Sequence, residues 1–152
     1  MTPRLNLFAH AALIKPLLDM SQKVAASGLE PSLLELVKLR ASQINGCAFC
    51  LDMHARDARK MGESEERIYM LDAWRESPLY SDRERAALAW TESLTLVAAT
   101  RAPDADYAMV KAAFSDEEQV KLTMAIVTIN AWNRLNVAFR TVPAGRGASK
   151  AA

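Results

Sequence analysis

Apolar side chains recur along this chain at intervals of three and four residues, the spacing that forms one face of an α-helix. No segment of strand length alternates apolar and polar residues, and no Asn-Gly or Asp-Gly pair separates two such segments. The pattern therefore predicts an all-α protein. The predicted helices cover residues 4–26, 31–44, 47–61, 65–76, 82–99, 104–114 and 116–140.

Residues that commonly start or stop helices support these boundaries. Two segments, 81–84 and 115–118, have the Ser-x-x-Glu spacing of a capping box at a helix start. Asn45-Gly46 predicts a break between two helices. Pro16 lacks a backbone N–H, so we expect it to kink or divide the first helix.

The last predicted helix is apolar around most of its circumference. Such a helix is buried, either in the core of its own chain or in a subunit interface. The tryptophans at positions 74, 90 and 132 add large apolar area, and aromatic residues are favoured in interface cores. The main apolar stripe of this helix consists of Val120, Met124, Val127, Ala131, Leu135 and Ala138.

The length of 152 residues fits one domain with its own core. We expect a single helical domain over residues 1–142 and a flexible C-terminal tail over 143–152, where no core pattern is present. Hydrophobic residues make up 51% and charged residues 24%, as in globular proteins. The net charge of +1 argues against a nucleic-acid-binding protein, which usually has a basic excess.

No membrane span is expected. The longest uncharged stretch, residues 122–133, is only 12 residues long, whereas a span needs about 18 or more. The apolar N-terminal stretch is interrupted early by His10 and Lys15, and we interpret it as mature chain rather than a signal peptide. These observations predict a cytoplasmic protein.

The two cysteines and one histidine form the most informative pattern. A bridge between residues only three apart removes little unfolded-state entropy, so Cys47 and Cys50 indicate chemistry or metal binding. With His54 they have the i, i+3, i+7 spacing that places side chains on one helix face. The positive end of that helix favours a thiolate, which His54 could stabilise or generate as a base.

Glu35 lies 12 residues before Cys47, on the preceding predicted helix. The turn at Asn45-Gly46 would fold that helix back, so that Glu35 could orient His54 or relay its proton. A purely structural alternative is a capping box formed by Ser32 and Glu35.

Three interpretations of the cysteine pair remain open at this level. The first is redox chemistry. The second is a zinc site with Cys47, Cys50 and His54 as ligands and Glu35 or water as the fourth, although a closed zinc site normally has four strong ligands. The third is a non-catalytic helical scaffold with inert thiols. His10 is expected at the surface or in the core, and solvated faces or ion pairs are expected for Lys38, Arg40, Arg56, Arg59 and Lys60.

The segment from Glu35 to His54, with the pattern E-x2-K-L-R-x-S-Q-I-N-G-C-x2-C-x3-H, resembles the core motif of the alkyl hydroperoxidase D (AhpD) branch of the carboxymuconolactone decarboxylase family. Residues 129–136 resemble a later helix of that family. The likeness is clear over residues 30–70 and weaker to about residue 140. The decarboxylase branch lacks the cysteine pair, which argues against lactone decarboxylation here.

The resemblance implies an AhpD-like helical fold that interlocks into a homo-oligomer, a hexamer built from three dimers or alternatively a trimer. It also implies that the cysteines reduce hydroperoxides and cycle through a disulfide. On this pattern Cys50 attacks, Cys47 resolves, and His54 with Glu35 relays a proton to Cys50. The helix dipole alone would favour Cys47 as the thiolate, whereas the i to i+4 relation to His54 favours Cys50.

The implied partners are small molecules and a reductant, and no cofactor is expected. The substrate would be an organic hydroperoxide or hydrogen peroxide, and the reductant a dithiol such as a lipoyl protein or a thioredoxin-like protein. Phe49 stands where the best-known peroxidase of the family has a second histidine between its cysteines. That member of the proton relay is therefore absent from this chain.

Overall fold

The computed structural model describes residues 2–143, and all regular structure in that range is helical. The predicted all-α class is therefore confirmed. The elements in chain order are η1 (Leu7–His10), α1 (Ala11–Ala25), α2 (Pro31–Ile44), α3 (Ala48–Lys60), α4 (Glu65–Tyr69), η2 (Met70–Ala73), α5 (Asp82–Thr95), α6 (Val97–Thr100), α7 (Asp104–Ala113) and α8 (Asp116–Phe139).

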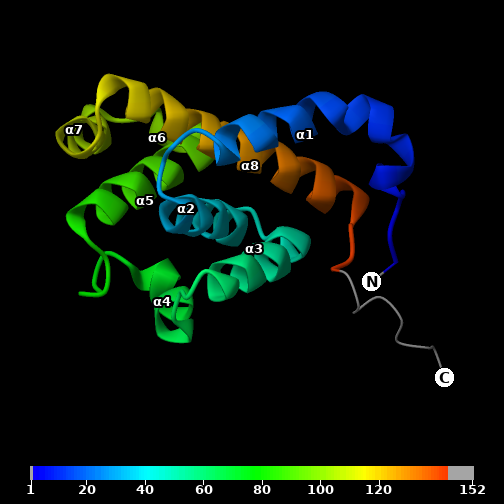
Figure 1. The fold of residues 1–152 in the computed structure, drawn as a ribbon, viewed down its shortest axis with the longest axis horizontal. Helices are drawn as coiled ribbons and strands as arrows, with labels where there is room; N and C mark the ends of the chain where they lie inside the picture. The colour runs from blue at the N-terminus through cyan, green and yellow to red at the C-terminus, as the bar shows by residue number, and fades with distance from the viewer. Residues whose placement is uncertain (1, 144–152) are drawn as a thin grey trace.

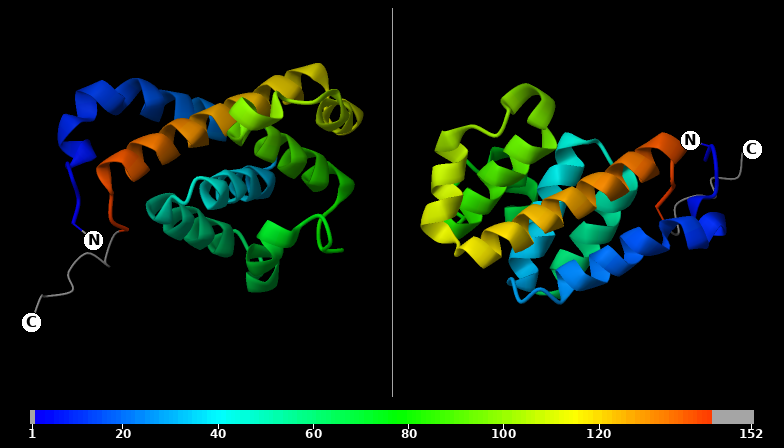
Figure 2. Two further views of the ribbon diagram at one scale, coloured as in Figure 1. Left: turned by 180° about the vertical axis from the view of Figure 1, so that it is seen from behind. Right: turned by 90° about the horizontal axis from the view of Figure 1, so that it is seen from above.

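Helix α2 lies at the centre of the molecule and packs against α3, α5 and α8 (Figure 1). Helices α1 and α8 run side by side along one edge, and both views in Figure 2 show them together. The largest core cluster joins α1, α2, α5, α7 and α8, and a second joins α2, α3, η2 and α5. The N-terminus of α3, where the cysteines lie, consequently faces α8.

Most helix boundaries lie close to their predicted positions, with three differences. The predicted helix over 65–76 is divided into α4 and the 3-10 helix η2, which ends at Ala73. The first predicted helix is split at His10 into η1 and α1, while α1 continues without division through Pro16. Ala12, whose carbonyl loses a helical partner at Pro16, is exposed, so water can satisfy it. The predicted helix over 82–99 is interrupted at Leu96, whose backbone (φ −102°, ψ 27°) separates α5 from α6.

Both predicted capping boxes are formed. Ser81 and Glu84 bond to each other's backbone N–H groups at the start of α5, and Ser115 and Glu118 do the same at the start of α8. These reciprocal bonds satisfy donors that a helix start leaves unpaired. The two helices therefore begin where local sequence specifies.

Helix α8 has two apolar faces, and only one of them is covered. The buried face includes Leu122, Ile126 and Ile129. At 100° per residue, the stripe containing Val120 and Val127 lies on the opposite side. These two side chains are 64% and 48% exposed, so this stripe is not part of the core of the chain.

The tryptophans differ from the sequence expectation. Trp74 and Trp90 are buried in the two core clusters, so they are not available to an interface. Trp132 is half-buried and donates from Nε1 to the Ser21 hydroxyl at 2.8 Å, which ties α8 to α1.

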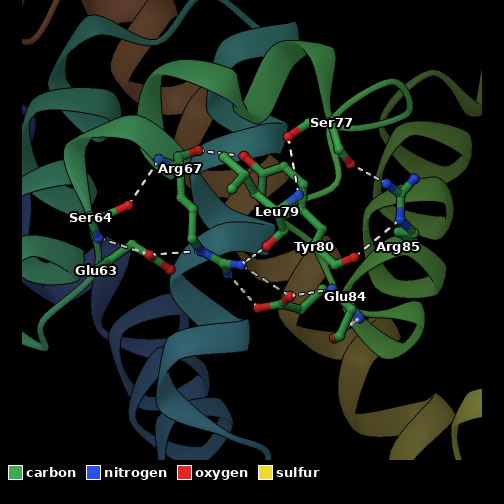
Figure 3. A network of polar contacts seen from close by, with 9 residues as sticks. Glu63, Ser64, Arg67, Ser77, Leu79, Tyr80, Glu84 and Arg85 are labelled. Carbon is green, nitrogen blue, oxygen red and sulfur yellow. Dashed lines mark hydrogen bonds and ion pairs between the residues drawn. The ribbon is translucent and has the colours of Figure 1, made fainter.

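A polar network holds the loop between η2 and α5 (Figure 3). Arg67 on α4 pairs with Glu63 at 2.8 Å and with Glu84 at 2.6 Å, and it also donates to the Leu79 carbonyl. The Tyr80 hydroxyl donates to the Arg67 carbonyl. This network fixes a connection without regular structure and lies outside the cysteine site.

Within residues 2–143, no helix is long and apolar enough to cross a membrane. Most of the predicted C-terminal tail, residues 144–152, lies outside the described residues. The predicted domain boundary at residue 142 stays a prediction.

Candidate active site

The cysteine pair lies at the junction between α2 and α3. The chain turns at Gly46, which has a φ of +64°, and the Cys47 N–H then donates to the Ser42 carbonyl at 3.0 Å. Cys47 is the N-cap of α3 rather than a residue of its first turn, because its backbone is extended (φ −86°, ψ 92°). Its sulfur accepts from the Cys50 N–H at 3.4 Å. Both sulfurs therefore lie at the positive end of α3.

The two thiols are free, buried and hydrogen-bonded to each other, with a Sγ–Sγ distance of 2.7 Å. The hydrogen bond from the Cys50 thiol, aided by backbone N–H groups, lowers the pKa of Cys47 to about 7 despite burial. The same hydrogen bond, together with burial, raises the pKa of Cys50. Above a pH of about 7, the favoured state of the pair is therefore a Cys47 thiolate that accepts a hydrogen bond from the Cys50 thiol.

Glu35 reaches His54 from the adjacent helix. Its Oε2 lies 2.8 Å from His54 Nδ1, and its Oε1 lies 2.7 Å from the Lys38 ammonium. The alternative capping box with Ser32 is wrong, because Glu30 is the N-cap of α2 and the Glu35 carboxylate is used elsewhere. The fold thus brings together the carboxylate and imidazole that sequence spacing had placed on neighbouring helices.

The charge on Glu35 determines which nitrogen of the His54 ring carries a proton. Burial by itself raises the pKa of Glu35, but the hydrogen bonds from His54 and Lys38 outweigh it and leave the pKa below its ordinary value. An ionised carboxylate only accepts hydrogen bonds, so His54 Nδ1 is protonated. In the neutral ring, Nε2 is then the basic nitrogen.

An apolar cavity of about 250 Å³ opens onto this site. Cys50, His54 and Lys38 lie in its lining, whereas Cys47 does not. The walls come from η1 and α1 (Phe8, Leu18), from α3 (Phe49, Met53) and from α8 (Ile129, Trp132). Of the two sulfurs, Cys50 is thus the one that faces a space large enough for a small organic molecule.

Phe49 adds an apolar side chain to the cavity lining at the position where the second histidine of the relay is absent. Its ring faces Phe8 with the centroids 6.2 Å apart, an ordinary separation for an aromatic pair. This position therefore supplies no proton donor, and the two phenyl rings form an apolar contact between η1 and α3. The remaining ionisable groups in the cavity lining are Lys38, Cys50 and His54.

Two asparagines of α8 complete the site, and sequence reasoning gave them no role. Asn136 donates to Cys50 Sγ at 3.6 Å, and Asn133 donates to the Ser42 hydroxyl at 3.0 Å. Asn133 also accepts from Asn45 at 2.9 Å, which binds α8 to the turn before the cysteines. The available signal was a set of asparagines at positions 130, 133 and 136 on the buried face of an otherwise apolar helix.

The positions of the side chains at this site do not fit the zinc alternative. Among residues 2–143, no three His, Cys, Asp or Glu side chains are gathered in a way that could hold a metal ion. His54 instead uses Nδ1 for Glu35, and the two sulfurs bond to each other.

The basic side chains near the site are ion-paired, as expected, and His10 is exposed. Arg40 is the most buried of them and pairs with Glu92 at 2.8 Å. The others pair as Lys38–Glu35, Arg56–Asp52, Arg59–Glu65 and Lys60–Asp57.

Comparison with known proteins agrees with this architecture. Residues 11–93 match the carboxymuconolactone decarboxylase family. The uncharacterized protein YdfG of Bacillus subtilis is 45% identical over 137 residues, which span 90% of each chain. The crystal structure of ATU0492 from Agrobacterium tumefaciens, a protein of unknown function described as a candidate antioxidant defence protein AhpD, superposes with a TM-score of 0.91 at 46% identity, covering 93% of this chain and 98% of that one.

A more distant likeness concerns the fold alone. An uncharacterized peroxidase-related protein from Silicibacter sp. TM1040 has a TM-score of 0.78 at 22% identity, over 90% of this chain and 72% of that one.

The all-helical domain has the AhpD-like fold. By the match to more than half of its residues and by its close relatives, the chain belongs to the carboxymuconolactone decarboxylase family.

Proposed function

We propose that this protein is a thiol-dependent hydroperoxide reductase, an alkylhydroperoxidase that cycles Cys47 and Cys50 through a disulfide. The observation that carries the proposal is a single arrangement. Two thiol sulfurs lie 2.7 Å apart and hydrogen-bonded at a helix N-terminus, and one of them lines an apolar cavity whose wall also includes a histidine bonded to a buried carboxylate. An organic hydroperoxide combines an apolar body with a reactive polar end, which suits such a cavity.

In the first step Cys50 attacks the terminal oxygen of the hydroperoxide. Its proton passes to the Cys47 thiolate, a new S–O bond forms, and the O–O bond breaks. Cys50 is oxidised by two electrons to the sulfenic acid. The leaving alkoxide takes a proton from His54, which accepted it on Nε2 when the Cys47 thiol ionised, and departs as an alcohol; Glu35 stabilises the imidazolium in the interval.

In the second step the Cys47 thiol attacks the sulfur of the Cys50 sulfenic acid. An S–S bond forms, the S–O bond breaks, and the hydroxide leaves with the Cys47 proton as water. An external dithiol, of the lipoyl or thioredoxin-like type, then restores both thiols by disulfide exchange and is itself oxidised. The cycle consumes one hydroperoxide and one dithiol for each alcohol and water released.

The deciding experiment is a thiol count on the reduced protein before and after an equimolar pulse of tert-butyl hydroperoxide. The proposal expects two thiols before the pulse and none after it, with one equivalent of tert-butanol released. The metal content is measured on the same sample. Thiols that persist through the pulse, or a stoichiometric zinc content that protects them, would contradict the proposal.

The pH dependence of the pair follows from the lowered pKa of Cys47 at about 7. Since this group is an acid, its thiolate fraction increases as the pH rises through about 7, reaching about half at neutral pH against a few per cent for an ordinary cysteine. The ultraviolet absorbance of the thiolate should show this midpoint. Replacement of Cys50 by alanine removes the hydrogen bond that is the main cause of the lowered Cys47 pKa, so the midpoint should move upward. An unchanged midpoint would contradict this hydrogen bond as the cause.

The relay is tested by replacing Glu35 with glutamine. The amide still bonds to His54 but no longer stabilises a charged ring, so kcat/KM for tert-butyl hydroperoxide should fall by about 10- to 100-fold. The matched control is Glu30→Gln, which changes an ion-paired carboxylate at the start of the same helix but away from the cavity. Equal rates in the two variants would leave Glu35 with a structural role only.

A further inference from the structure

Asn136 has a buried hydrogen-bond acceptor that is unpaired within the part of the chain that the structure describes. The side chain is only 3% exposed, and its Nδ2 donates both to the Trp132 carbonyl at 3.0 Å and to Cys50 Sγ at 3.6 Å. Its Oδ1 has no hydrogen-bond partner among residues 2–143. A buried polar atom that is left unpaired costs about 1–3 kcal/mol, so such atoms in proteins call for an explanation.

The orientation of this amide follows from its surroundings. The Trp132 carbonyl only accepts hydrogen bonds, so the amide nitrogen must face it. Exchanging the nitrogen and oxygen would place two carbonyl oxygens together. The unpaired atom is consequently an acceptor, and the group that satisfies it must be a donor.

The cavity is the place from which that donor can come. Asn136 lies in the cavity lining together with Cys50 and His54. A hydroperoxide has a single donor, the hydrogen on its terminal oxygen. Asn136 donates to the Cys50 sulfur, and its Oδ1 offers the hydrogen-bond acceptor that the hydroperoxide hydrogen requires.

We propose that Asn136 is a catalytic residue that binds the hydroperoxide. Its Oδ1 accepts the O–H of the substrate while its Nδ2 donates to Cys50 Sγ. The inference rests on the proposed function and assigns to that site a group that recognises the reacting end of the substrate. It also defines the substrate chemically as a hydroperoxide with a free O–H, rather than a dialkyl peroxide.

In this arrangement the Asn136 amide bonds to both reacting atoms, the Cys50 sulfur and the terminal oxygen of the hydroperoxide. The oxygen that bears the hydrogen is the one that Cys50 attacks, so a single amide holds both ends of the new S–O bond. Alignment of this kind increases the rate because the reacting atoms are held near contact before bond formation. The other peroxide oxygen, which becomes the alcohol, is left free to receive the proton from His54.

The test compares two reactions of the same sulfur. Reduction of tert-butyl hydroperoxide requires the acceptor, whereas alkylation by iodoacetamide requires only the thiolate. In Asn136→Leu, the ratio of the hydroperoxide rate to the alkylation rate should fall by tenfold or more across the pH profile. In Asn136→Asp both rates should fall, because the donor to Cys50 is lost, but the ratio should stay within about threefold of the wild type since an acceptor remains.

The matched control is Thr91→Val. Thr91 lies on α5, outside the cavity lining, and its hydroxyl donates to the Ala87 carbonyl at 2.7 Å. This variant should keep both rates near those of the wild type. Asn136→Ala is measured in parallel, and if Asn136→Leu loses its helical circular dichroism, the alanine variant takes its place.

Each outcome decides the proposal. If Asn136→Leu or Asn136→Ala changes neither rate while the wild type is active, the role of Asn136 is overturned and the proposed function stays intact. A parallel loss of both rates restricts Asn136 to thiolate stabilisation and overturns substrate binding. A wild type that is alkylated normally but does not reduce tert-butyl hydroperoxide overturns the proposed function and this inference with it.

Discussion

Replacement of Cys50 by serine will abolish hydroperoxide reduction, with a loss in kcat/KM of about 1000-fold or more, because the attacking sulfur is removed. The prediction depends on which sulfur the substrate can reach, and not on which sulfur is ionised before the substrate binds. Cys47 has the lowered pKa, but Cys50 is the sulfur in the cavity lining. The proton between them needs to move only across the 2.7 Å contact to exchange the charge. The measurement is turnover of tert-butyl hydroperoxide with dithiothreitol as the reductant.

The complementary variant, Cys47→Ser, separates attack from resolution. It retains the sulfur in the cavity, so one equivalent of hydroperoxide should still be consumed and a sulfenic acid should accumulate on Cys50. The internal disulfide cannot form. A dimedone adduct on Cys50, identified by mass spectrometry, provides the readout. If Cys47→Ser instead loses the first oxidation and Cys50→Ser retains it, the two roles are reversed.

The second large effect concerns assembly. We propose that the exposed stripe of α8 is covered by other copies of this chain, in a hexamer of three dimers or in a trimer. Replacement of Val127 by lysine should then dissociate the assembly. It should also remove the dependence of the melting temperature on protein concentration, which coupled folding and association produce in the wild type. Sedimentation at low micromolar concentration measures the subunit count.

The physical reason lies in the two faces of α8. One face packs into the core of the chain, and the opposite stripe leaves Val120, Met124 and Val127 between 40% and 64% exposed. A helix that is apolar on both sides needs a second partner, and closed symmetric homo-oligomers are the usual arrangement. A lysine at the centre of such a contact would place a charge in an apolar interface, which costs several kcal/mol when the charge is unpaired.

The control is Val97→Lys on α6, which makes the same chemical change at a side chain that is equally exposed, at 48%. This variant should leave the subunit count unchanged. A folded monomer in the wild type, with a melting temperature independent of concentration, would contradict the assembly. The apolar stripe would then be an uncovered surface of a single chain.

The helices and their boundaries could be predicted from sequence because their signals are local. Apolar spacing, two Ser-x-x-Glu capping boxes and Gly46 act within a few residues of where they lie. The same holds for the spacing of Cys50 and His54, which share α3. Interactions within one turn of helix depend on backbone geometry alone, so their consequences follow without knowledge of the rest of the fold.

The rest of the site depended on how distant helices pack. Glu35 could have capped its own helix, and only the packing of α2 on α3 directs its carboxylate to His54. Asn136 lies 86 positions from Cys50, and no spacing rule connects the two. The choice between core and exposed face on α8 was equally open, because both faces are apolar. Local sequence specifies each helix and its chemical groups, whereas contacts between helices arise from the packing of the whole chain, and here that packing placed the amide beside the sulfur and enclosed the cavity.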